Sequence, residues 1–274
     1  MLKGEHVFLS GGNLPWINYA YDFGNNQWAG VKSRVENQMK YNSLRPPLSN
    51  RLWIHIQGET SPQFDNNGYV IATDMQGTLI SDVQDMLNLA QRYDILVIPT
   101  LWNAAVDQDR SHRLDGLIVD TRKLTSYIQV VLTPLVRASN PDPCFDTTRL
   151  QNSGAGWAGK KYNFQQMLRE IFFQTQGKLD FYQFHSYSWQ GKFDNVSPFL
   201  HQWRDYGTGK PIVIGEFNRQ DGGGRTMNQL FEYVYRHGYS GAWSWDLVSQ
   251  GQDQRGGISH IRNYSGNGKI AIDI

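Results

Sequence analysis

The chain has 274 residues, a net charge of +1 at pH 7, a pI near 7.8 and a mean hydropathy of −0.54. This length suits one large α/β domain or two small ones. The near-neutral charge argues against nucleic acid and acidic membrane surfaces as partners. The aromatic content is high, with 9 Trp, 14 Tyr and 13 Phe, and rings beyond the needs of a core often lie where sugars stack.

Cysteine and histidine usage limits the chemistry further. Cys144 is the only cysteine, so the chain forms no internal disulfide and no cysteine-based metal site. The 7 histidines include no His-x-x-x-His or similar pair, which argues against a metallohydrolase, and we expect no metal and no cofactor. Residues 1–6 contain no apolar segment typical of a secretion signal, so a cytosolic protein and a secreted one without its signal both remain open.

Short apolar segments alternate with amphipathic ones, which is the pattern of a parallel sheet or barrel with intervening helices. We expect six parallel strands whose C-terminal ends lie on one face. These strands are 6–10, 51–57, 94–100, 179–185, 210–216 and 240–245. Polar or aromatic residues follow each strand, at the end where barrel enzymes place their chemistry.

Apolar residues at helical spacing predict the helices between these strands. Ser81 and Gln84 are typical of a capping box at the start of one helix. Pro134 should bend or end another, and Gly238 should stop a third. The predicted helices lie near 28–39, 81–90, 124–135, 164–172 and 227–234.

The number of strands falls short of a complete barrel. A closed (β/α)₈ barrel needs eight strands, and the pattern predicts six. Residues 137–161 are rich in Asn, Pro, Asp, Gly and Ser and contain no strand-like run. The sequence therefore predicts an α/β fold of the (β/α)₈ TIM-barrel type, incomplete with about six strands, in a single domain over 1–274.

Glu216 stands at the C-terminal end of a strongly apolar predicted strand. Retaining glycoside hydrolysis needs two carboxyl groups about 5–5.5 Å apart, one a nucleophile and one a proton donor. Glu216 is placed for the nucleophile's role, although a strand-terminal Glu in a surface ion pair is the alternative. His185 and Tyr187 share one face after the preceding strand and could orient this carboxylate. Trp245 ends the following strand and offers a stacking floor for a sugar ring.

Six longer blocks carry a more specific signal. They are 8–16 (FLSGGNLPW), 19–24 (YAYDFG), 51–59 (RLWIHIQGE), 101–106 (LWNAAV), 180–189 (DFYQFHSYSW) and 214–217 (IGEF). Together they resemble the invertebrate endo-β-1,4-mannanases of glycoside hydrolase family 5, and they span most of the chain. The resemblance implies a TIM barrel that cleaves β-1,4-mannosidic bonds in mannan or glucomannan by a retaining double displacement.

The resemblance also implies roles for single residues. Glu216 matches the family's nucleophile, and Arg51 matches the arginine of strand two that braces it. His185 and Tyr187 match the His-x-Tyr of strand six. The residues expected to bind substrate are Trp53, Trp102, Trp189 and Trp245.

One part of the family pattern is missing. The resemblance places the acid/base in an Asn-Glu pair that ends strand four, and this chain contains no Asn-Glu dipeptide. It also implies a longer segment, with strand five, between Leu168 and Gly177. Both deletions agree with the missing strands. Glu59 and Asp107 are candidate substitutes for the acid, by location only.

Two functions therefore stay open. The first is an endo-mannanase whose activity is weak or absent for want of its acid. The second is a non-catalytic mannan-binding or structural relative, either a pseudoenzyme or a shortened isoform. In both, the expected partner is β-mannan or glucomannan, with no nucleic acid and no membrane. The resemblance implies an extracellular location, although no signal peptide is present in this chain.

Overall fold

The computed structural model describes residues 8–42, 48–103, 112, 114–138, 181–187, 197–249 and 251–264. Its main sheet has six parallel strands in the order β5-β2-β1-β8-β7-β6. The strands are β1 (Leu9–Leu14), β2 (Leu48–Trp53), β5 (Ile95–Thr100), β6 (Tyr182–Ser186), β7 (Ile212–Phe217) and β8 (Gly241–Ser244). All six predicted strands are present, and their parallel arrangement is confirmed.

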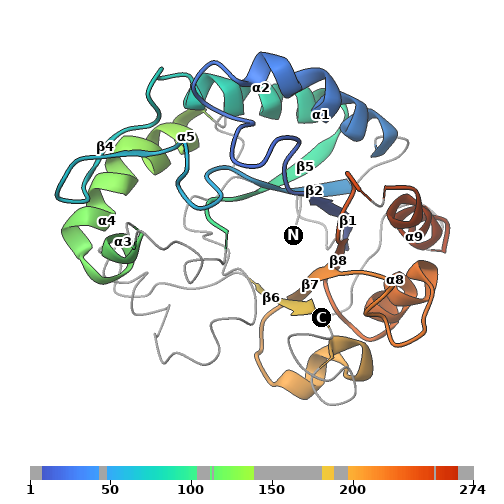
Figure 1. Cartoon of the computed structure of the whole chain (residues 1–274). Helices are drawn as coiled ribbons and strands as arrows, with labels where there is room; N and C mark the ends of the chain where they lie inside the picture. The colour runs from blue at the N-terminus through green and yellow to red at the C-terminus, as the bar shows by residue number, and fades with distance from the viewer. Residues whose placement is uncertain are drawn as a thin grey trace.

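The helices lie on the outer side of an arc of strands (Figure 1). They are α1 (Trp28–Asn42), α2 (Leu79–Arg92), α3 (Asp115–Val119), α4 (Thr121–Tyr127), α5 (Thr133–Ala138), α8 (Met227–Arg236) and α9 (Gly251–Tyr264). Short 3₁₀ helices occupy Pro198–Leu200 and Trp203–Tyr206. Helix α2 contacts β5, while α8 and α9 pack on each other and reach β8 and β1. Within the described ranges no helix is long and apolar enough to cross a membrane.

The concave side of the sheet also holds buried side chains. Trp243 of β8 is fully buried, and its indole N–H donates to the hydroxyl of Ser49 in β2 at 2.7 Å. Strand β1 lies between these two strands, so the bond spans the hollow of the sheet. Among the described strands the sheet stays open, with β5 and β6 at its edges. The predicted barrel-type fold with about six strands is confirmed.

Strand β1 spans Leu9–Leu14 rather than the predicted 6–10. It continues past the predicted end because its two glycines belong to the strand. A Cβ at Gly11 would lie 1.7 Å from the carbonyl oxygen of Ser49, and one at Gly12 would lie 2.7 Å from the Leu247 side chain. Neighbouring chains approach too closely here for any side chain, so the glycines permit the strand rather than end it. Strand β2 ends earlier than predicted, since Ile56 adopts a φ of 56° that turns the chain away from the sheet.

The predicted start of helix α2 is wrong in detail. Helix α2 begins at Leu79, and the carboxylate of Asp74 accepts the backbone N–H groups of Thr78 and Leu79 at 3.0 and 3.1 Å. Ser81 lies inside the first turn and donates to the Thr78 carbonyl, so it forms no capping box with Gln84.

Pro134 does not end its helix. A π-helical segment at Ile128–Leu132 precedes it, and helix α5 continues to Ala138. The changed hydrogen-bond register of the π segment falls where proline lacks an N–H. Gly238 does follow the end of α8 with a φ of 78°, as predicted.

Several elements were not predicted, among them helix α3 and the two 3₁₀ helices. An antiparallel hairpin, β3 (Gln63–Phe64) with β4 (Val70–Ala72), stands outside the main sheet. The sequence pattern did not predict helix α9, because glycines interrupt its apolar stripe. A Cβ at Gly257 would lie 2.6 Å from both Met227 and Phe231, so this glycine lets α9 approach α8 closely. The predicted helix at 164–172 and most of the interval 137–161 lie outside the described residues.

Candidate active site

The carboxylate of Glu216 lies at the C-terminal end of β7 and pairs with Arg51 of β2. Arg51 Nη1 donates to Glu216 Oε1 at 2.5 Å, and the two side chains are 1% and 12% exposed. Three strand spacings separate β2 from β7, which is about 14 Å in a flat sheet. The contact exists because the sheet curves and the two side chains meet on its concave side.

The second carboxylate oxygen of Glu216 contacts two side chains from the end of β6. The Tyr187 hydroxyl donates to Oε2 at 3.1 Å, and Nδ1 of His185 lies 3.3 Å from the same oxygen. Burial raises the pKa of Tyr187, and the Glu216 charge raises it further, so this hydroxyl keeps its proton. Burial also lowers the pKa of His185 to about 4, against the opposing effect of Glu216. The imidazole is therefore neutral at pH 7, with its Nδ1 facing Oε2.

Asn13 organises the floor beneath this pair. Its Oδ1 accepts from Arg51 Nη1 at 3.1 Å, while its Nδ2 lies 3.0–3.1 Å from the carbonyls of Gly215, Trp243 and Ser244. One fully buried amide thus links β1, β7 and β8 to the arginine. Sequence reasoning missed Asn13, because an Asn after two glycines was interpreted as the end of a strand.

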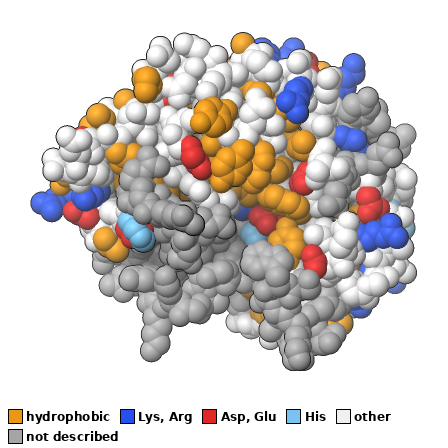
Figure 2. All heavy atoms as spheres, in the orientation of Figure 1, with side chains coloured by type: hydrophobic (Ala, Val, Ile, Leu, Met, Phe, Trp, Pro, Cys, Tyr) orange, Lys and Arg blue, Asp and Glu red, His pale blue; other side chains and the backbone are white. Residues whose placement is uncertain are grey.

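Aromatic rings form a wall beside the carboxylate. Trp53 and Trp245 meet edge to face at 5.5 Å, and Trp16 contacts them at 6.1 and 6.0 Å. Tyr19 extends the wall through Trp16, at 5.0 Å. Figure 2 shows hydrophobic side chains gathered near the middle of this face. The arginine that holds Glu216 lies 4.1 Å over the Trp53 ring, which fixes both groups together.

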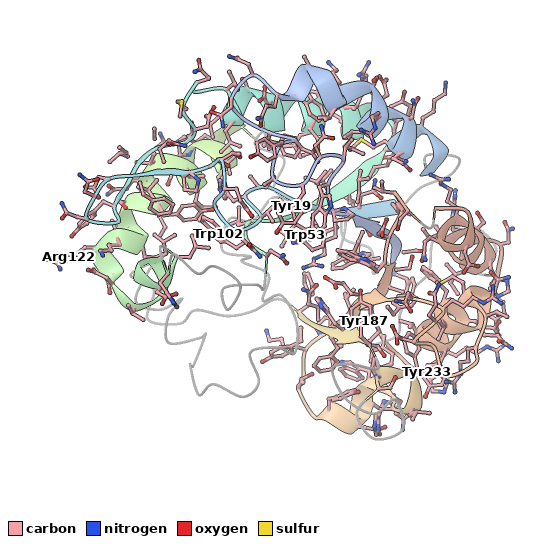
Figure 3. The ribbon with its side chains drawn as sticks, in the orientation of Figure 1. Tyr19, Trp53, Trp102, Arg122, Tyr187 and Tyr233 are labelled. Atoms are coloured by element: carbon pink, nitrogen blue, oxygen red, sulfur yellow. The ribbon has the colours of Figure 1, made fainter. Side chains whose placement is uncertain are left out.

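Trp102 lies near this wall, just beyond the end of β5. Figure 3 shows it beside Tyr19 and Trp53, with Tyr187 farther away toward the lower right. The His55 ring packs against the Trp102 ring with their centroids 4.7 Å apart. The Tyr127 ring also packs against Trp102, at 5.4 Å. His55 is buried, and burial lowers its pKa to about 3, so it is a neutral ring at physiological pH.

The structure brings together six of the predicted site residues. Glu216, Arg51, His185 and Tyr187 are in direct contact, and Trp53 joins them through Arg51. Trp245 joins through Trp53. Trp189 and Asp107 lie outside the described residues.

Glu59 is described, but its contacts are elsewhere. It accepts the backbone N–H of Gln57 at 2.9 Å, hydrogen-bonds to Tyr19 and lines a separate cavity. Within the described ranges, none of its recorded contacts is with Glu216.

This geometry is that of an ionised carboxylate surrounded by donors and bordered by aromatic faces. No family model matches the chain. A mannan endo-1,4-beta-mannosidase of Mytilus edulis is 38% identical over 341 residues, covering 99% of this chain and 92% of that protein. The solved β-1,4-mannanase of the sea hare Aplysia kurodai is 45% identical with a TM-score of 0.83, covering 100% and 97% of the two chains. The endo-1,4-beta-mannanase of Eisenia fetida is 31% identical with a TM-score of 0.80, covering 100% and 96%.

The chain belongs to the invertebrate endo-β-1,4-mannanases of glycoside hydrolase family 5. The predicted family is confirmed. The alignment with the mussel mannanase runs over 341 residues, whereas this chain has 274. Since the match spans nearly all of both chains, the mussel mannanase has internal segments that this chain lacks. This agrees with the two strand units that the sequence pattern fails to supply.

Proposed function

We propose that this mannanase family member cleaves β-1,4-mannosidic bonds within mannan or glucomannan chains by retaining double displacement, with Glu216 as nucleophile. The observation that carries the proposal is the support of its carboxylate by Arg51, Tyr187 and His185. Three groups from two strands hold one side chain, which is the preorganisation that nucleophilic attack requires.

In the first step the Glu216 carboxylate attacks the anomeric carbon of the sugar. The bond from that carbon to the glycosidic oxygen breaks, and the leaving oxygen takes up a proton. In the second step water attacks the same carbon, loses a proton and releases Glu216 from the glycosyl ester. Arg51, Tyr187 and His185 keep the carboxylate oriented between turnovers.

The aromatic wall supplies the substrate contacts in this proposal. Trp245 and Trp53 border the carboxylate and offer ring faces to the sugar that is cleaved. Trp102 serves a sugar farther along the chain. Such faces suit neutral polysaccharides, because stacking needs no charge on the ligand.

The first step also needs a proton donor. The described side chains that contact Glu216 are an arginine, a tyrosine and a histidine, and the Asn-Glu pair that would supply the acid is absent from the sequence. The Asp221 carboxylate lies close enough to raise the pKa of Tyr187. General acid catalysis contributes about 10²–10⁴ in rate, so we expect slow cleavage of mannan. Glu59 and Asp107 remain candidate donors.

The second candidate function is mannan binding without hydrolysis, which the absent Asn-Glu pair favours. Both functions place the protein outside the cell, because a polysaccharide does not cross membranes. In both, residues 1–274 form a single domain. Reducing-sugar release from mannan by wild type and Glu216→Gln separates them. Release that depends on Glu216, with retention at the anomeric carbon by NMR, supports the enzyme. Tight mannan binding with no release from any mannan substrate supports the binding protein.

A further inference from the structure

A cavity of about 420 Å³ lies away from Glu216, between the β3–β4 hairpin, the turn after β2 and helices α3 and α4. Its volume falls in the range of about 300–1,000 Å³ typical of small-ligand sites. Glu59, Phe64, Asp65 and Lys123 are among its lining residues. Its aromatic and ionisable side chains are therefore the Phe64 ring, the His112 imidazole, two carboxylates and one ammonium group.

Gly58 connects the cavity to Trp102. It lines the cavity and has a φ of +82°. A Cβ at Gly58 would lie 3.5 Å from Trp102 Cζ3 and 3.9 Å from Phe64 Cε2. Trp102 and the cavity's own aromatic residue thus flank one backbone position.

The Lys123 side chain passes close to the backbone of two glycines. A Cβ at Gly116 would lie 2.9 Å from Lys123 Cδ, and one at Gly68 would lie 3.2 Å from its Nζ. Both glycines line the cavity and leave room for the lysine stem. Among the described residues Lys123 makes no ion pair, so its N–H groups are available to a ligand.

The acceptors of the cavity are also fixed. Asp65 Oδ1 accepts the backbone N–H groups of Asn67 and Tyr69 at 2.9 and 2.8 Å, which locks the hairpin turn. Glu59 Oε2 accepts the backbone N–H of Gln57. Two carboxylates against one ammonium disfavour an anionic ligand, whereas a polyol can donate to the carboxylates and accept from the lysine.

A continuous run of side chains connects the cavity to the nucleophile. Trp53 contacts Trp16, and Trp16 contacts Tyr19. The Tyr19 hydroxyl hydrogen-bonds to the side chains of Glu59 and Asn103. Figure 3 shows the same direction, from Tyr187 past Trp53 and Tyr19 to Trp102, with Arg122 of helix α4 at the far edge.

We propose that this cavity binds a neutral hexose unit of the polysaccharide at a distance from the cleaved bond. The inference rests on the proposed function, since it assumes that mannan lies along the aromatic wall. The hexose is either a main-chain unit beyond the groove or a branch sugar, and both present the same hydroxyl groups to Lys123, Glu59 and Asp65.

Titration calorimetry on Glu216→Gln protein, which does not consume its ligand, tests this. Three ligands are compared: mannotriose, mannohexaose and a galactosyl-substituted mannotriose. In the same background, Lys123→Ala should weaken binding of mannohexaose or of the branched ligand about tenfold, the scale of a lost hydrogen bond to a charged group. Mannotriose binding should not change. The ligand that responds identifies the source of the hexose.

Lys210→Ala is the matched control, because Lys210 is equally half-buried but precedes β7 at the opposite end of the sheet. Glu59→Gln is a second test variant that preserves side-chain shape and should also weaken the responding ligand. Equal affinities for Lys123→Ala and its parent on all three ligands would overturn the inference and leave the proposed function intact. Absence of binding by the parent protein to any of the three would overturn both.

Discussion

Arg51 and Glu216 are 165 residues apart in sequence, and the guanidinium of one donates to the carboxylate of the other. The pair closes the hollow between β2 and β7, on either side of β1 and β8. Burial lowers the pKa of Arg51 while the Glu216 charge raises it, so the carboxylate is what makes a fully buried guanidinium tolerable. The pair therefore joins two strands across the concave side of the sheet and supports the nucleophile together with Tyr187 and His185.

Arg51→Met should remove that support at similar side-chain volume. We expect a loss of about 3 kcal/mol in the free energy of unfolding, because a partly buried carboxylate loses its cation. Any measurable glycosidase rate should fall at least about 100-fold, the scale of a misplaced catalytic group. Urea denaturation and initial rates check both. Arg122→Met is the control, since Arg122 is 80% exposed in its pair with Asp120 and should change stability by less than about 1 kcal/mol. Equal losses in the two variants would contradict this role for Arg51.

Gly11→Ala should abolish the native fold or come close to doing so. Its Cβ would lie 1.7 Å from a backbone oxygen of the neighbouring strand, which no side-chain movement relieves. Gly30→Ala is the matched control, because Gly30 lies on the exposed side of helix α1 with nothing within 4 Å. That change should raise the free energy of unfolding by about 0.5–1 kcal/mol through helix propensity. Circular dichroism melting curves distinguish the two, and a well-folded Gly11→Ala protein would show that β1 and β2 are not paired in this register.

The protein should lose stability as the pH falls from about 6.5 to about 4. His185 and His55 have folded-state pKa values of about 4 and about 3, below the usual value near 6.5. In this window the unfolded chain binds protons that the folded chain does not, so acid favours unfolding. His185 alone should cost up to about 3 kcal/mol across the window.

Melting temperatures measured from pH 7 to pH 4 test this pH dependence. His185→Gln should flatten the decline, whereas His112→Gln should not, because His112 is 75% exposed at the surface. Identical slopes in all three proteins would count against a buried, neutral His185.

Trp245→Ala should weaken mannotriose binding about 3- to 10-fold, which corresponds to about 0.5–1.5 kcal/mol for one ring. Trp203→Phe serves as the control, since Trp203 donates its indole N–H to the Lys210 carbonyl before β7 and lies outside the wall. Calorimetry on both variants provides the comparison. Unchanged mannotriose affinity in Trp245→Ala would remove this ring from the sugar site.

Sequence periodicity was sufficient for the strands because parallel strands buried on both faces are continuous apolar runs, as in Ile212–Phe217. It failed at Gly11 and Gly12, since a glycine signals a turn unless the close approach of another chain is known. It also failed at Ser81, because the first backbone N–H groups of helix α2 are accepted by Asp74, a residue that lies before the helix.

The candidate site was predictable where the residues end strands. Glu216, His185 and Tyr187 follow this rule, and Arg51 came from family resemblance. Asn13 and Trp16 were not assigned roles, because their contacts depend on which strands become neighbours. The cavity beside the β3–β4 hairpin could not be predicted from the sequence either, since a two-residue strand such as β3 leaves no periodic signal.

The most direct test of the account is turnover of 2,4-dinitrophenyl β-mannobioside and of mannan by the pure protein, with and without azide. A good leaving group needs little protonation, and azide attacks a glycosyl ester without a general base. With Glu216 as nucleophile and no efficient acid, we expect measurable release of dinitrophenol, faster in azide with β-mannobiosyl azide as product. We also expect very slow cleavage of mannan and loss of all turnover in Glu216→Gln. Dinitrophenol release that is insensitive to azide and survives in Glu216→Gln would contradict this account.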